Sequence, residues 1–189
     1  MSESIRSFIA FDIDNKEILM QVAQAQDKLR ETGANLKFVQ PENIHITMRF
    51  LGNIQPSMID RIYNEMKNVT FSPFDVNIRG LGAFPSRKYA RVVWAGITKG
   101  ADELEVIFSQ LEPRLRKLGF KPDLKGFRPH ITIARVRTGR NKVELARFIR
   151  EYANHEFGVL RVECLKLKQS ILMLNGPLYS TLKETHAHT

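Results

Sequence analysis

Two stretches, Asn43-Ile44-His45-Ile46-Thr47-Met48 and Pro129-His130-Ile131-Thr132-Ile133, carry most of the information in this sequence. Both are apolar and rich in β-branched residues, a composition typical of buried β-strands. Side chains alternate between the two faces of a strand, so the His and the Thr of each stretch point the same way. A shuffled chain of this composition is expected to contain about 0.02 His-Ile-Thr tripeptides. Two copies therefore indicate shared chemistry or shared ancestry.

The two motifs lie 130 − 45 = 85 positions apart, and the order of predicted elements repeats at that offset. Each half begins with a buried strand, continues with an amphipathic helix and the motif strand, and ends with a second helix and a third strand. The paired segments are 6–13 with 91–98, 16–31 with 101–116, 56–68 with 141–153, and 74–81 with 159–167. Further strands are expected at 36–39, 89–97 and 178–183.

This order predicts an α+β fold with two β-α-β-α-β lobes. We expect a pseudo-twofold axis to relate the lobes, with antiparallel or mixed sheets lining a central cleft and the helices outside. Residues 1–189 are interpreted as a single bilobal domain, duplicated over approximately 5–85 and 90–183, with 184–189 as a frayed tail. The two His-Thr pairs would then face each other across the cleft.

Composition narrows the functional class. The formal net charge of +9 favours an anionic partner, and nucleic acid is the foremost one. We expect no contact with a membrane, because no apolar run approaches the roughly 20 residues that span a bilayer. Cys164 is the sole cysteine, so the sequence excludes an intramolecular disulfide and predicts no Cys-based zinc site. The absence of a signal-peptide pattern and of paired cysteines indicates a cytoplasmic location.

Two imidazoles on either side of a small gap suit acid–base catalysis near neutral pH. A neutral imidazole at one side can take a proton from an attacking water, and an imidazolium at the other can protonate a departing oxygen. The hydroxyls of Thr47 and Thr132 can donate hydrogen bonds to non-bridging phosphate oxygens. In-line displacement at phosphorus fits this arrangement, and no metal is required for it.

Three arginines are candidate substrate contacts. Arg49 lies four residues after His45, so regular strand alternation would put it on the face of that histidine. Arg128 has the matching alternation relative to His130, although a proline lies between them. Arg135 has the wrong alternation and reaches the site only through a bulge or a twist of the strand end. A solvated basic side chain is the competing interpretation for each.

At these residues the chain resembles the 2H phosphoesterase superfamily, named for paired His-x-Thr-x motifs. The resemblance is greatest to its RNA 2′,3′-cyclic phosphodiesterase branch, also called LigT-like proteins or 2′-5′ RNA ligases. It covers almost the whole chain. Besides the two motifs it extends to residues 6–11, 41–44, 49–52, 82–85, 91–96 and 128–129.

The resemblance implies a bilobal fold and hydrolysis, without a metal or other cofactor, of RNA 2′,3′-cyclic phosphate ends to 2′-phosphomonoesters. It makes His45 the proton donor to the leaving 3′ oxygen and His130 the proton acceptor that activates water. It assigns Thr47 and Thr132 to the phosphate, and Arg135 matches a position where the family often has Arg. The partners it implies are RNA ends such as those of transfer-RNA fragments, bound by a monomer.

Several alternatives remain open. An ATP-driven ligase is disfavoured, because residues 121–124 lack the Gly of a Lys-x-Asp-Gly adenylation site and no phosphate-binding loop is present. Nucleotide-independent 2′-5′ joining is permitted as a side activity. A non-catalytic RNA-binding module could stack bases on aromatics such as Phe8, Phe11 and Phe50, yet it leaves the repeated motif unexplained. A 2H phosphoesterase acting on another cyclic phosphate or on a 2′,5′-linked oligonucleotide also fits.

A metal hydrolase is the remaining alternative. His45 and His130 would be its ligands, but neither motif supplies a matched Asp, Glu or third His. His186 and His188 form a His-Ala-His in the expected tail and would at most bind a metal incidentally.

Overall fold

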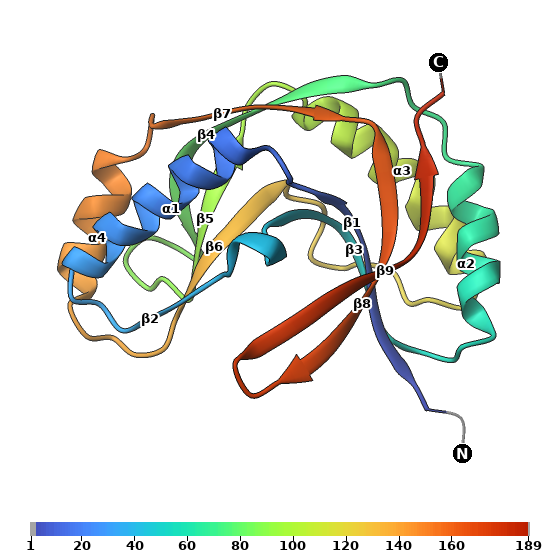
Figure 1. Cartoon of the computed structure of the whole chain (residues 1–189), viewed down its shortest axis with the longest axis horizontal. Helices are drawn as coiled ribbons and strands as arrows, with labels where there is room; N and C mark the ends of the chain where they lie inside the picture. The colour runs from blue at the N-terminus through green and yellow to red at the C-terminus, as the bar shows by residue number, and fades with distance from the viewer. Residues whose placement is uncertain (1–2, 189) are drawn as a thin grey trace.

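Two antiparallel sheets form the framework of the computed structural model, which describes residues 3–188 (Figure 1). We call them the β1 sheet and the β5 sheet. The β1 sheet has the order β3 (His45–Ile54), β1 (Ile5–Asp12), β8 (Cys164–Met173) and β9 (Gly176–His186). The β5 sheet has the order β2 (Leu36–Phe38), β6 (His130–Val136), β5 (Val92–Ile97), β4 (Phe74–Phe84) and β7 (Glu156–Val162). These sheets confirm the expected α+β class.

Helices cover one face of each sheet. α1 (Lys16–Glu31) and α4 (Lys142–Glu151) pack on the β5 sheet, whereas α2 (Met58–Lys67) and α3 (Ala101–Lys117) pack on the β1 sheet (Figure 1). Apolar side chains at helical spacing explain this packing, because each helix buries one stripe against its sheet. The buried apolar residues are Ile18, Val22, Ala25 and Leu29 in α1, and Leu104, Ile107, Leu111 and Leu115 in α3.

The two halves of the sequence exchange elements between the lobes. β4 belongs to the first half but pairs with β5, and β8 belongs to the second half but pairs with β1. Likewise α1 packs on the β5 sheet and α3 on the β1 sheet. The expected halves at 5–85 and 90–183 therefore do not coincide with the two sheets. Local periodicity specifies which element forms, but the pairing of distant strands depends on tertiary contacts.

The C-terminal part of the chain differs from the sequence expectation in two places. The strand expected at 159–167 is interrupted at Glu163, so β7 lies in the β5 sheet and β8 in the β1 sheet. The tail is not frayed as far as His188, because β9 continues through His186. Beyond it the Ala187 N–H donates to the Glu163 carbonyl (2.8 Å) and the His188 N–H to the Phe71 carbonyl (2.9 Å). Thr189 lies outside the described residues.

Buried apolar side chains from both sheets and from all four helices named above form a continuous core. Ile46 and Ile131, the middle residues of the two motifs, are fully buried in it. Their burial directs the flanking His and Thr side chains to the opposite face of each sheet. Among residues 3–188, no helix has the length and apolar character needed to cross a bilayer.

Candidate active site

The two motif histidines are the first residues of β3 and β6, and these strands contact each other where the two sheets meet. His45 and His130 are both half-buried on the face away from the helices. A positive charge on His130 lowers the pKa of His45, so the two imidazoles lie near enough to interact electrostatically.

Both imidazoles are oriented by a backbone carbonyl two residues earlier in the chain. His45 Nδ1 lies 2.7 Å from the Asn43 carbonyl oxygen, and His130 Nδ1 lies 2.6 Å from that of Arg128. A carbonyl oxygen only accepts hydrogen bonds, so each Nδ1 must carry a proton and donate it. Nε2 is therefore the atom of each ring that can gain or lose a proton in a reaction.

The threonines lie beside these reactive nitrogens. Thr47 Oγ1 is 2.8 Å from His45 Nε2, and Thr132 is half-buried at the matching position after His130. A hydroxyl so placed can bond to the same phosphate whose bridging oxygen meets the imidazole. The structure thus brings together the four motif residues that the sequence singled out.

Aromatic side chains pack against both histidines. The rings of Phe8 and Tyr179 lie 5.0 and 5.4 Å from the ring of His45 between centroids. The ring of Phe84 lies 4.9 Å from that of His130, with an interplanar angle of 86°. Burial among these rings lowers the pKa of both histidines below the usual value, because desolvation penalises the imidazolium. The carbonyls at Nδ1 act in the opposite direction.

Each motif strand contains a β-bulge three residues after its histidine. In β3, Ile9 pairs with Arg49 and Ala10 with Thr47, which leaves Met48 without an opposite residue. In β6, Val93 pairs with Ala134 and Trp94 with Thr132, which leaves Ile133 unopposed in the same way. Each bulge reverses the alternation of the residues that follow it.

The bulge at Met48 overturns the expected position of Arg49. Its guanidinium lies on the helix side of the β1 sheet, where Nε donates to Glu112 of α3 over 2.8 Å. The two side chains are only 10% and 16% exposed. Arg49 is therefore a structural residue rather than a substrate contact, and Phe50 faces the site in its place. The ring of Phe50 lies 6.2 Å from that of Phe8.

We expect Arg49→Met to lower the free energy of unfolding by about 1.5–3 kcal/mol, since it leaves a mostly buried carboxylate without its charged partner and with only the Asp123 N–H as donor. Urea unfolding should show a smaller loss for Arg49→Met combined with Glu112→Gln than the sum of the two single changes. The exposed pair Arg161–Asp75 is the control and should contribute about 0–1 kcal/mol. Equal losses for the two ion pairs would contradict the structural role of Arg49.

The bulge at Ile133 has the opposite consequence for Arg135, because it removes the alternation problem noted in the sequence. Burial lowers the pKa of His130 and raises that of Tyr179, and the charge of Arg135 lies near enough to both to act on them as a lowering influence. A side chain of α1 forms hydrogen bonds to the backbone at this bulge. Gln26, which is buried, donates from Nε2 to the carbonyls of Ile133 (3.0 Å) and Val39 (2.9 Å).

The third arginine contributes through its backbone. Arg128 lies just before β6, and its carbonyl orients His130. Its side chain is exposed, and no contact with a motif residue is found for it within residues 3–188.

A carboxylate lies beside His45 but not beside His130, although the charges of Lys168 and His130 also act on His45 and lower its pKa. Asp12 pairs with His45 across β1 and β3, and its carboxylate raises the pKa of that imidazole. Lys168 and Lys166 hold this carboxylate through Nζ at 2.8 and 3.0 Å. Burial alone would raise the pKa of Asp12, but the two ammonium groups more than offset it and keep the group ionised. Arg135, in contrast, lowers the pKa of His130.

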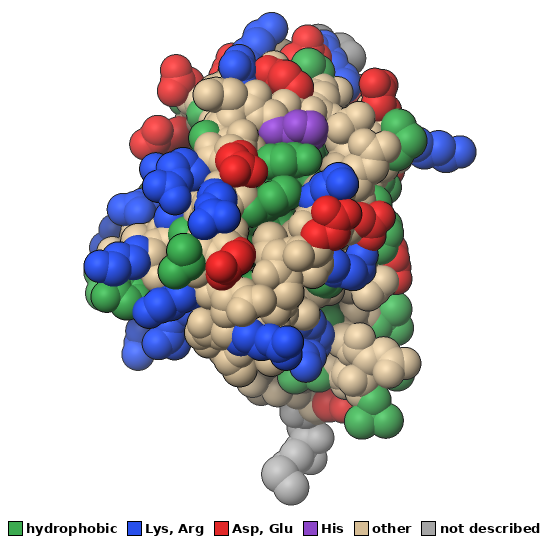
Figure 2. All heavy atoms as spheres, turned by 90° about the vertical axis from the view of Figure 1, so that its left-hand side faces the viewer, with side chains coloured by type: hydrophobic (Ala, Val, Ile, Leu, Met, Phe, Trp, Pro, Cys, Tyr) green, Lys and Arg blue, Asp and Glu red, His purple; other side chains and the backbone are tan. Residues whose placement is uncertain are grey.

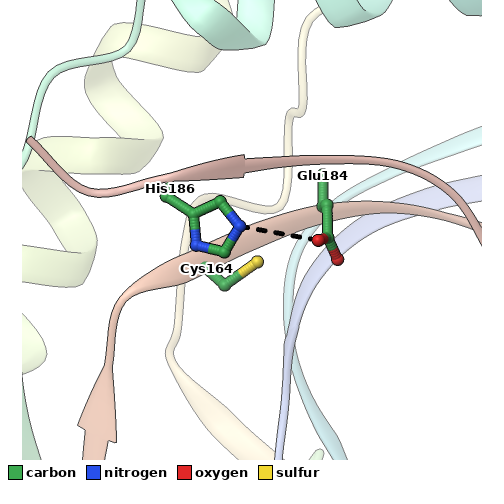
Figure 3. Close-up of side chains that lie close together, drawn as sticks. All are labelled: Cys164, Glu184 and His186. Atoms are coloured by element: carbon green, nitrogen blue, oxygen red, sulfur yellow. Dashed lines mark ion pairs between the residues drawn. The ribbon is translucent and has the colours of Figure 1, made fainter.

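One cluster in the described part of the chain could hold a metal ion. Cys164, Glu184 and His186 project from the paired strands β8 and β9, and their ligand atoms lie within 4.8 Å of one another (Figure 3). His186 Nε2 and Glu184 Oε1 are 3.5 Å apart. The sequence missed this grouping, because a lone cysteine shows no metal-binding spacing and strand register alone brings its partners to it. Neither motif histidine belongs to the cluster.

Comparison with known proteins agrees with this geometry. A model of the family described as LigT like phosphoesterase matches residues 13–94 and 96–179. The chain belongs to this family. The match confirms the resemblance inferred from the paired motifs.

LigT-like relatives extend over nearly the whole chain. A protein of Aeropyrum pernix named RNA 2′,3′-cyclic phosphodiesterase is 40% identical over 167 residues, 88% of this chain and 95% of its own. One of the same name from Methanothermobacter thermautotrophicus is 36% identical over 181 residues, 95% of this chain and 97% of its own. A Thermus thermophilus crystal structure superposes with a TM-score of 0.80 at 25% identity, covering 96% of this chain and 97% of that one.

Escherichia coli LigT, solved in complex with 3′-AMP, shares the LigT-like fold. Its TM-score is 0.79 at 21% identity, with 99% of this chain and all of that one covered. Tyr179 and Asp12 are site neighbours that sequence reasoning missed, and it considered Phe50 only as a base-stacking ring of a non-catalytic module. Of these three, only Phe50 could have been found from the internal repeat. It follows His45 by five positions, as Arg135 follows His130, and it lies 85 positions before Arg135.

Proposed function

We propose that this chain hydrolyses RNA 2′,3′-cyclic phosphodiester ends to 2′-phosphomonoesters by acid–base catalysis between two histidines. The observation that carries the proposal is the pair of imidazoles whose Nδ1 atoms are bound to carbonyls, so that two Nε2 atoms remain for the substrate. The names of the relatives support the substrate class.

The proposed reaction is a single in-line displacement. His130 Nε2 accepts a proton from water as the water oxygen bonds to phosphorus. The bond from phosphorus to the 3′ oxygen breaks, and His45 Nε2–H donates its proton to that oxygen. Thr47 and Thr132 donate hydrogen bonds to the non-bridging oxygens, where negative charge accumulates. The product is a 2′-phosphomonoester with a free 3′ hydroxyl, and a proton exchange with solvent resets both imidazoles.

The neighbouring charges support this division of roles. A proton donor must start as imidazolium, and the Asp12 carboxylate beside His45 favours that form. A proton acceptor must start neutral, and the Arg135 guanidinium beside His130 disfavours its protonation. These two charges agree with the assignment of acid and base implied by the family resemblance, although burial and the ammonium of Lys168 act against the imidazolium form of His45.

We expect a bell-shaped pH dependence of kcat/KM that is displaced to the acid side of the usual imidazole pKa of about 6.5. Burial lowers the pKa of both histidines, so protonation of His130 limits the acid side and deprotonation of His45 limits the alkaline side. An anionic substrate favours imidazolium, so the profile of kcat should lie at higher pH than that of kcat/KM.

Variants of two aspartates sharpen this pH test. Asp12→Asn should move the alkaline limb to lower pH, because a charge that raises the pKa of His45 is lost. The control is Asp14→Asn, a change at an exposed neighbour. A flat native profile between about pH 5 and 8 would refute the paired-histidine mechanism.

Phe50 is the candidate platform for the terminal base. Its side chain is 62% exposed on the site face, and each stacked base contributes about 1–3 kcal/mol in proteins that bind single strands. Phe50→Ala should therefore raise KM about tenfold with a smaller effect on kcat, whereas Phe50→Tyr should retain the native KM. Met20→Ala, at an exposed apolar side chain on α1, is the control. An unchanged KM for Phe50→Ala would remove this residue from the substrate site.

The decisive experiment is incubation with an RNA that ends in a 2′,3′-cyclic phosphate, followed by identification of the product isomer. A 2′-phosphate supports the proposal. A 3′-phosphate would mean that the 2′ oxygen leaves, and no reaction would favour another cyclic phosphate or a 2′,5′-linked oligonucleotide. Full activity in excess chelator is expected, and loss of activity there would favour a metal hydrolase.

Nucleotide-independent 2′-5′ RNA joining is a proposed side activity of the same site. The 5′ hydroxyl of a second RNA would replace water, bond to phosphorus and form a 2′-5′ phosphodiester as the 3′ oxygen leaves. We further propose a monomer that acts on RNA ends such as those of transfer-RNA fragments in the cytoplasm. The free thiol of Cys164 fits such a reducing compartment.

A further inference from the structure

A basic groove lies beside the active site, between α4 and the loop 85–91 that joins β4 to β5. Its volume is about 460 Å³. The residues that line it are Arg87, Lys88, Lys142, Val143, Ala146 and Arg150. Figure 2 views the molecule from the side that carries α4, where Lys and Arg side chains gather along the left-hand side and in a band lower down, with acidic side chains fewer among them.

The α4 side of the groove is basic because of its helical spacing. Lys142, Ala146 and Arg150 follow one another at intervals of four, so they form one stripe along the helix. Successive residues of a helix are turned by about 100°, so Glu144 and Glu151 project in other directions than this stripe. Within residues 3–188, none of the four cations that line the groove forms an ion pair with an acidic side chain. Their positive charge therefore remains available to an external anion.

An exposed aromatic ring accompanies these cations. Tyr89 is 62% exposed, and the ammonium groups of Lys88 and Lys142 lie 5.6 and 5.9 Å from its ring centroid. The Tyr89 N–H donates to the hydroxyl of Ser86 over 3.3 Å, which helps to fix the loop. Cations beside an open aromatic face are the combination that binds single-stranded nucleic acid, where phosphates meet the charges and bases stack on the ring.

One end of the loop adjoins a motif histidine, and the other is bonded to the end of β6. It begins after Phe84, whose ring packs on His130, and Arg87 follows three residues later, within a chain length of about 10 Å. At its other end the carbonyl of Arg91 accepts a hydrogen bond from the Val136 N–H of β6 over 2.9 Å. The loop that lines the groove is therefore attached to the end of β6 that carries Arg135, which pairs with Val92.

We propose that this groove binds the phosphodiester backbone of the RNA on the 5′ side of its cyclic phosphate end, with Tyr89 stacking on a base. The inference rests on the proposed function and gives it a substrate class. The preferred substrate is a single-stranded RNA several nucleotides long rather than a free cyclic nucleotide.

Two measurements on one pair of variants test the groove. The first is the Kd for a fluorescent single-stranded RNA of about ten nucleotides that ends in a 2′-phosphate, which the proposed reaction does not consume. The groove variant is Lys142→Ala with Arg150→Ala, and the control is Arg61→Ala with Lys67→Ala on α2, which removes the same charge from the other lobe. We expect the groove variant to bind RNA about 10- to 100-fold more weakly than the control. Its slope of log Kd against log salt should be lower by about 1.4, for two lost phosphate contacts.

The second measurement compares kcat/KM for a cyclic mononucleotide and for a longer RNA with the same end. Relative to the native protein, the groove variant should lose at least about tenfold more kcat/KM on the longer RNA than on the cyclic mononucleotide. Equal Kd values for the groove and control variants would overturn the proposal, since only net charge would then matter. Binding of anionic lipid vesicles that is lost in the groove variant while RNA binding stays native would assign the groove to membranes and also overturn it. If the native protein cleaves neither substrate, the proposed function fails, while the RNA Kd still decides on the groove.

Discussion

Replacing either His130 or His45 by alanine should lower kcat by about 10²–10⁴-fold. The change at His130 removes the group that accepts a proton from water, and the change at His45 removes the donor to the leaving 3′ oxygen. Because the two act in one displacement, the double variant should lose much less than the product of the two single losses. The three variants are compared by their kcat on a substrate with a 2′,3′-cyclic phosphate.

A substrate with a good leaving group separates the two roles. A nitrophenyl phosphodiester needs no acid to expel nitrophenolate, so the loss caused by His45→Ala should shrink while that of His130→Ala persists. The reverse pattern would exchange acid and base. His155→Ala is the control, because this ring packs on Tyr152 and Phe157 away from the motifs. Native turnover in His45→Ala or His130→Ala would refute the mechanism. The affinity of both variants for RNA should stay near native.

The second large effect is expected at the threonines. Thr47→Val and Thr132→Val keep the shape of the side chain but remove the hydroxyl that donates to a phosphate oxygen. Each should lower kcat by about 10²-fold, the usual loss for one donor at a developing charge. Thr47→Val should also shift the pH profile, because Oγ1 lies 2.8 Å from His45 Nε2.

Serine variants provide the matched control for the threonines. Thr47→Ser and Thr132→Ser keep the donor and should recover most of kcat, whereas loss of packing alone would not be rescued in this way. Thr185→Val in β9 should leave kcat native, because this residue lies outside the site. Valine variants with native kcat would show that the hydroxyls do not contact the phosphate.

The arginines show where sequence reasoning succeeded and where it failed. Regular alternation misplaced Arg49, whereas Arg135 was expected to reach the site only through a bulge, and a bulge is present in each strand. A bulge depends on hydrogen bonds from elsewhere in the fold. The carbonyl of Ile133, for example, is held by Gln26 of a helix more than a hundred residues earlier.

The sequence by itself predicted the candidate catalytic residues of this protein and the order of most of its elements. Two identical tripeptides at a fixed offset predicted paired His and Thr side chains on two strands, since residue type and strand alternation are local properties. Only the tertiary structure decided which strands pair, so β4 and β8 cross between the lobes and Phe50 rather than Arg49 faces the site. The physical reason is that strand partners and bulges depend on hydrogen bonds and packing between residues far apart in the chain.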